Sequence, residues 1–183
     1  TMDHELKKLM SLYWEVVNKY GEDGKILPEM ILVCNAILQD LKHPNHFIRG
    51  CTLRFLCRVK EFDLIQPLIP AIEENLEHGD PFVRKYAVLA IYMILKNFGE
   101  DSIPDAAEQI ENFLMKETDS SARRNAFLML YRCAQDKAVS FFVSNVDKVL
   151  KYGDGFQLII LELTRKVCRD DPAQKSRFIK VLF

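Results

Sequence analysis

One segment combines a helix start, an arginine and a fully apolar helix: Asp80-Pro-Phe-Val-Arg-Lys-Tyr-Ala-Val-Leu-Ala-Ile-Tyr-Met-Ile-Leu95. Asp80 followed by Pro81 is typical of a helix N-cap and first helical position. The run from Tyr86 to Leu95 is apolar on every side, which predicts a helix covered by several neighbours. At ten residues, this run is the longest apolar one in the chain and is well short of the roughly 20 that cross a bilayer.

The same frame occurs twice more in the chain. A capping Asn or Asp is followed four residues later by an arginine, and three residues after that by a small residue. The arginines lie 35 and 39 residues apart, slightly under the period of helical-pair repeats. A fourth, degenerate copy has Gln157 in the arginine position. The three complete frames are Asn45 with Arg49, Asp80 with Arg84, and Asp119 with Arg123.

Helical periodicity extends to the rest of the chain, and no segment predicts a strand. We therefore predict an all-α fold, a right-handed α-solenoid of HEAT-like or armadillo-like helix pairs, with residues 1–183 forming a single solenoid segment. Because the chain opens with Thr1 and closes in an amphipathic run, we expect it to be part of a longer protein. The helices predicted outside the frames cover about residues 3–19, 28–41, 63–77, 104–117, 137–150 and 158–168.

Composition excludes several classes of protein. The 183 residues are 49% hydrophobic and 28% charged, and 25 Lys and Arg against 26 Asp and Glu provide no bulk positive field for nucleic acid. Seven scattered glycines form no phosphate-binding loop. Five unpaired cysteines favour a reducing, cytoplasmic compartment.

The sequence gives little support for a metal site or a catalytic site. His43, His46, Cys51 and Cys57 lie within fifteen residues of one another. However, six helical positions separate Cys51 from Cys57 and place them about 120° apart, so they do not converge on one ion. No histidine accompanies an exposed nucleophile. We expect no catalytic site, metal, cofactor or small-molecule substrate.

Charge is segregated between the two sets of helices. Basic residues concentrate in the helices that carry the frame, and acidic residues in the helices that precede them. In a solenoid the two sets line opposite faces. We therefore expect a basic concave face, suited to an acidic protein segment or another subunit, and an acidic convex face.

The frame itself is similar to the second helix of HEAT repeats, in which an aspartate and an arginine form a hydrogen-bonded ladder between repeats. Two further strings are more specific: Leu27-Pro-Glu-Met-Ile-Leu-Val-Cys-Asn-Ala36 and Thr52-Leu-Arg-Phe-Leu-Cys57. With them, nearly the whole chain resembles the adaptin-like trunk of coatomer β subunits. A nuclear transport receptor or a clathrin-adaptor large subunit is the alternative, and the first string argues against the former.

The resemblance implies a non-enzymatic coat subunit of the COPI coatomer, serving retrograde Golgi-to-ER and intra-Golgi transport. The implied partners are other coatomer subunits and an Arf family small GTPase in its GTP state. The implied location is cytoplasmic and peripheral, on Golgi membranes and COPI vesicles, with membrane association only through the coat.

The resemblance also implies that the GTPase surface lies on an early trunk helix, here residues 28–41. Ile31 and Cys34 share a face of this helix because they are three positions apart, and Asn35 lies beside them. The helix has more apolar residues than one buried stripe needs. We predict a partner surface at Ile31, Cys34 and Asn35, although packing against further helices explains the apolar excess equally well.

Overall fold

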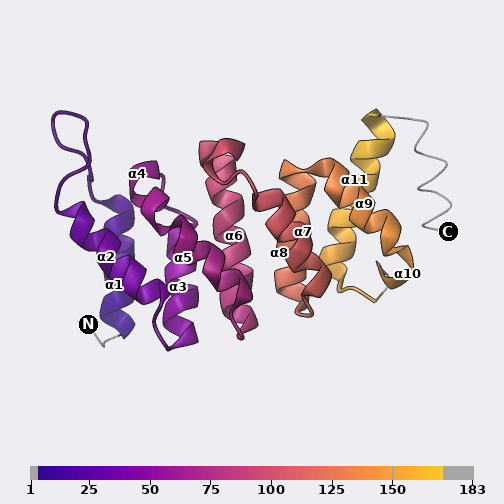
Figure 1. Cartoon of the computed structure of the whole chain (residues 1–183), viewed down its shortest axis with the longest axis horizontal. Helices are drawn as coiled ribbons and strands as arrows, with labels where there is room; N and C mark the ends of the chain where they lie inside the picture. The colour runs from indigo at the N-terminus through magenta and orange to yellow at the C-terminus, as the bar shows by residue number, and fades with distance from the viewer. Residues whose placement is uncertain (1–3, 150, 171–183) are drawn as a thin grey trace. The chain divides into compact units, whose positions relative to one another are not determined.

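The computed structural model describes residues 4–149 and 151–170 and divides into two compact units, residues 1–103 and 104–183. Within the described ranges no β-strand forms, and the only strand-like pairing is an isolated bridge between Tyr20 and Ile26. The predicted all-α class is confirmed, and Figure 1 shows helices throughout both units.

The first unit contains α1 (His4–Val16), α2 (Met30–Leu41), α3 (His46–Leu56), α4 (Phe62–Ile65), α5 (Ile69–Glu74) and α6 (Pro81–Phe98). Helix α3 packs against α2 and α6, and α5 packs against α6. The two frame-bearing helices, α3 and α6, are therefore direct neighbours, as expected for stacked helix pairs.

The second unit contains α7 (Ala106–Lys116), α8 (Ser120–Cys133), α9 (Gln135–Ser144), α10 (Val146–Val149) and α11 (Asp154–Asp170). Helix α8 is central, because α7, α9 and α11 all pack on it. Phe127 from α8 meets Phe141 of α9 and Phe156 of α11, with ring centroids 6.0 and 4.7 Å apart.

Two long predicted helices are interrupted. The predicted helix over residues 63–77 is instead α4, a 3₁₀ turn at Gln66–Leu68, α5 and a second 3₁₀ turn at Asn75–Glu77. Pro67 and Pro70 lie inside this segment, and each lacks a backbone N–H and crowds the preceding turn. The predicted helix over 137–150 divides at Asn145 into α9 and α10, and its last residue, Leu150, lies outside the described residues.

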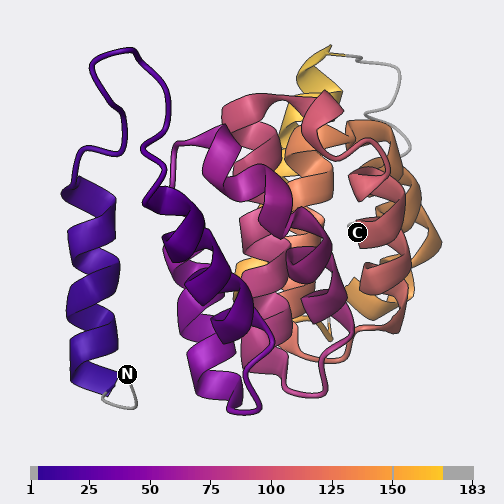
Figure 2. The ribbon, with the colours of Figure 1, turned by 60° about the vertical axis from the view of Figure 1, so that its left-hand side comes forward.

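Helix α1 ends at Val16 rather than at Lys19, and its apolar stripe is not buried. Leu6, Leu9, Met10, Tyr13 and Val16 are all exposed, Val16 to 83%. Ion pairs of Lys7 with Asp40 and of Glu15 with Arg58 connect α1 to the helix pair α2 and α3: Asp40 lies in α2, and Arg58 lies two residues after α3 ends. Figure 2 shows α1 beside this pair, with the long loop over residues 17–29 projecting from one end.

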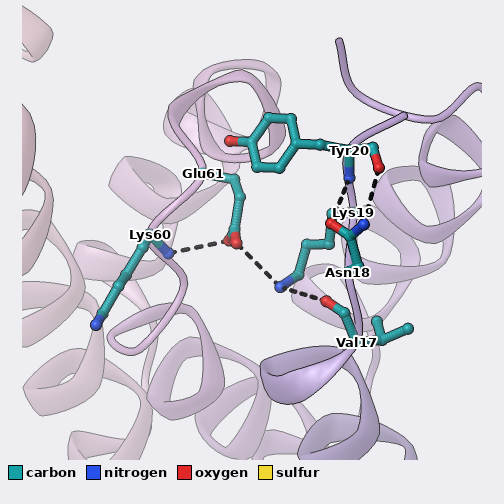
Figure 3. A network of polar contacts seen from close by, with 6 residues as sticks. All are labelled: Val17, Asn18, Lys19, Tyr20, Lys60 and Glu61. Atoms are coloured by element: carbon teal, nitrogen blue, oxygen red, sulfur yellow. Dashed lines mark hydrogen bonds and ion pairs between the residues drawn. The ribbon is translucent and has the colours of Figure 1, made fainter. Parts of the chain in front are cut away.

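A buried ion pair anchors the beginning of that loop. Lys19 Nζ lies 3.0 Å from Glu61 Oε1, with only 6% and 15% of the two side chains exposed. Lys19 Nζ also donates to the Val17 carbonyl, and the Glu61 carboxylate accepts from the Lys60 N–H (Figure 3). These extra hydrogen bonds offset the desolvation of the two charges. The pair joins the loop after α1 to the segment before α4.

Candidate functional site

The repeated frame forms the same hydrogen-bonded turn in three places. Each capping side chain accepts the backbone N–H two residues on: Asn45 from Phe47 at 2.9 Å, Asp80 from Phe82 at 2.8 Å, and Asp119 from Ser121 at 3.0 Å. This is the normal N-cap contact, which satisfies a donor that the first turn of a helix leaves free. Asn45, Asp80 and Asp119, the three predicted capping residues, each make this contact.

The arginine of each frame binds the backbone of the turn before the helix. In all three copies the guanidinium donates to the carbonyl six residues upstream: Arg49 to His43 at 2.6 Å, Arg84 to His78 at 2.9 Å, and Arg123 to Glu117. Gln157, in the degenerate copy, donates instead to the Tyr152 carbonyl at 2.8 Å, five residues upstream. The arginine thus closes the turn that connects one helix with the next.

The aspartate–arginine ladder that the HEAT resemblance implied is therefore not the arrangement of Arg49 and Arg123. The capping carboxylate or amide is occupied by backbone N–H groups, and the guanidinium by backbone carbonyls. One contact does connect successive helix pairs through this arginine: Arg49 donates to Asn75 Oδ1 at 3.2 Å. Asn75 is buried and donates in turn to the Leu41 carbonyl.

Sequence reasoning missed a third member of the turn. The residue six positions before each arginine accepts the N–H of the capping residue through its side chain: His43 Nδ1 from Asn45, His78 Nδ1 from Asp80, and Glu117 Oε1 from Asp119, at 3.0, 3.0 and 2.8 Å. His43 was considered above only as a metal ligand. Its common register with His78 and Glu117 was the available signal.

The cysteines near the candidate metal cluster have separate environments. Burial raises the pKa of the Cys57 thiol to about 12, and its Sγ donates to the Leu53 carbonyl. Cys51 is half-buried on α3, and Cys57 is the residue directly after that helix. In the described part of the chain, no three His, Cys, Asp or Glu side chains come together as a metal-ligand set.

The predicted partner surface on α2 is partly at the molecular surface. Ile31 is 63% exposed, and Asn35 is also exposed. Cys34 is half-buried, and its Sγ contacts the Leu64 carbonyl at 3.5 Å, so it lies at the edge of this surface. Leu32, which the sequence did not single out, is 71% exposed beside Ile31. The exposed apolar face of α2 therefore consists of Ile31 and Leu32, with Asn35 next to them.

Three helix pairs, α2 with α3, α5 with α6, and α7 with α8, are each connected by a turn that one arginine and one N-cap close, and this repetition is typical of a helical-repeat protein. Residues 1–182 match the family model described as Adaptin N terminal region, so the chain belongs to this family. None of the helices in the described ranges is both long and apolar enough to span a membrane.

The curated relatives are more specific and confirm the resemblance to coatomer β subunits. The chain is 51% identical to coatomer subunit beta of Rattus norvegicus over 181 residues, which are 99% of this chain and 19% of that protein. Coatomer subunit beta-2 of Arabidopsis thaliana is 50% identical, over 98% of this chain and 19% of the relative. Coatomer subunit beta of Dictyostelium discoideum is 50% identical, over 99% of this chain and 20% of that relative. The chain thus spans about a fifth of the length of these relatives.

Proposed function

We propose that this chain is a scaffold segment of a COPI coatomer β subunit, not an enzyme, that assembles with other coatomer subunits during retrograde Golgi-to-ER and intra-Golgi transport. The observation that carries this proposal is the identity of about half of the residues to coatomer β subunits over nearly the whole chain. It would act in the cytoplasm, peripherally on Golgi membranes and COPI vesicles. It would need no cofactor. A single solenoid segment over residues 1–183 belongs to the same proposal.

The recruitment step would use an Arf family GTPase in its GTP state, bound on α2. Two large apolar side chains on consecutive positions, Ile31 and Leu32, face solvent there, with the polar Asn35 alongside. Exposed apolar side chains with a polar rim are typical of a protein–protein contact. Cys34 would lie at the border of the contact, since its thiol is directed to the Leu64 carbonyl.

The test is capture of the chain by immobilised Arf loaded with GTP or with GDP. Ile31→Asp should abolish capture by the GTP form, because it places a charge in the apolar part of the contact. Leu158→Asp is the matched control: Leu158 is 66% exposed on α11, so it introduces the same charge without touching α2. Unchanged capture by a folded Ile31→Asp protein would place the GTPase elsewhere.

A further inference from the structure

The second unit contains an open cleft between the end of α7 and the α9–α10 region. Its volume is about 690 Å³, within the range of ligand-binding clefts. The lining combines an apolar base with cationic walls. No acidic side chain is among the described residues that line it. The cleft is far larger than the cavity of about 10 Å³ beneath Trp14 in the first unit, which has room for little more than a water molecule.

The base of the cleft is apolar and fixed. Leu114 of α7 and Phe141 of α9 line it, and both are buried in the core of the unit. Met115 is 66% exposed at the edge, where its flexible thioether can adapt to another side chain. Because Leu114 and Phe141 are almost completely covered, the apolar side chain of this lining that a ligand can reach is Met115, which is suited to contact one large apolar side chain.

One wall is a guanidinium held in place from two sides. Arg123 donates through Nε and Nη2 to the Glu117 carbonyl, and its guanidinium lies 4.8 Å from the centre of the Tyr152 ring. These two contacts fix the plane of the guanidinium in advance, and the hydrogen bonds among them use Nε and Nη2 rather than Nη1. A carboxylate is the natural partner of such a fixed arginine.

Two lysines also line the cleft. Lys148 and Lys151 are exposed and line the same cleft, so three positive charges surround the apolar base. Lys148 Nζ makes only a long contact, 3.4 Å, with Asn145 Oδ1. Because the described residues that line the cleft include no Asp or Glu, the lining itself supplies no negative charge to compensate these cations.

We propose that this cleft binds an acidic segment of a partner protein, which places one large apolar side chain against Met115, the exposed apolar side chain of the lining, and carboxylates against Arg123 and the two lysines. This proposal is based on the cleft and is independent of the GTPase surface proposed for α2. A flat anionic membrane fits less well, because headgroups could reach the lysines but could not fill the recessed apolar base.

The test is fluorescence polarisation with the 183-residue chain and a short labelled peptide that carries one phenylalanine between acidic residues. Lys148→Glu combined with Lys151→Glu should weaken binding about tenfold or more, because attraction at the rim becomes repulsion. The matched control is Lys60→Glu with Lys96→Glu, which makes the same charge change at exposed positions of the first unit and should alter the affinity less than about twofold. Ile31→Asp should leave peptide binding unchanged.

Two further peptides test the apolar and the charged contacts of the site separately. A peptide with serine in place of phenylalanine, and one with amides in place of carboxylates, should each bind at least about tenfold more weakly. Ser144→Trp, which fills the cleft from an exposed position, should also block binding while the circular dichroism melt shows a folded protein.

Equal losses in the two double-lysine variants would overturn the proposal in favour of non-specific electrostatics. Absence of peptide binding, together with lysine-dependent sedimentation on phosphatidylserine vesicles, would overturn it in favour of a membrane surface.

Discussion

At the scale of single residues, the repeat is defined by a small hydrogen-bonded turn. An N-cap, an arginine four residues later and a side-chain acceptor two residues earlier recur in three turns, each with the same bond pattern. Each turn leaves polar backbone groups at a helix end, and these groups cost free energy unless they are paired. The frame residues supply the partners.

Asp80 is the best position for measuring the cap. Asp80→Ala should lower the free energy of unfolding by about 1 kcal/mol, because the Phe82 N–H loses its acceptor. Asp105→Ala is the matched control: Asp105 occupies the N-cap position of α7 but makes no side-chain cap bond, so little change is expected. Urea denaturation of both variants measures the difference, and equal losses would contradict the capping role of Asp80.

At the scale of helices, close packing between the two frame-bearing helices α3 and α6 depends on a glycine. A Cβ added to Gly50 would lie 2.2 Å from Phe82 Cε1 and 2.3 Å from Cδ1. The Phe82 ring is in turn stacked on Phe47, with centroids 5.9 Å apart and an interplanar angle of 7°. The absence of a side chain at Gly50 therefore permits the contact between α3 and α6.

Gly50→Ala should destabilise the protein by about 1–3 kcal/mol, the usual range for an overpacked contact. This sign is informative, because alanine in place of glycine inside a helix otherwise stabilises by about 0.5–1 kcal/mol. In Gly50→Ala combined with Phe82→Leu the two losses should be less than additive, since the smaller side chain relieves the clash. Thermal unfolding of the single and double variants measures the coupling.

Gly79→Ala is the control for that experiment, because a Cβ at Gly79 meets no atom within 4 Å. A destabilisation by Gly50→Ala no larger than that by Gly79→Ala would show that α3 and α6 can move apart without loss.

At the scale of the whole molecule, burial is uneven within the first unit. Helix α6 buries Val83, Ala87, Val88, Ala90 and Ile91 completely. Helix α1 instead exposes most of its apolar side chains and contacts the unit chiefly through ion pairs and Trp14. Surface ion pairs of this kind contribute little to stability.

We expect α1 to open independently of the rest of the unit. In hydrogen–deuterium exchange, amides of residues 8–16 should exchange at least about tenfold faster than those of residues 85–97 in α6, since little apolar surface must be exposed to open α1. Mass spectrometry of peptic fragments gives both rates in one experiment. Equal protection of the two helices would show that α1 unfolds only together with the core.

The helical class, the register of the three frames and the three N-caps could be predicted from the sequence, because periodicity and capping depend on residues within about four positions of one another. The sequence also contained Pro67 and Pro70, the local reason for the interruption at residues 63–77. Four features depend on how the helices pack and could not be predicted: the partners of Arg49 and Arg123, the exposed stripe of α1, the half-burial of Cys34 beside exposed Ile31, and the cationic cleft. Residues from distant parts of the chain provide the contacts of a long side chain such as Arg49 or Arg123. They also determine whether an apolar helix face is buried or exposed. Spacing along one helix cannot specify those neighbours.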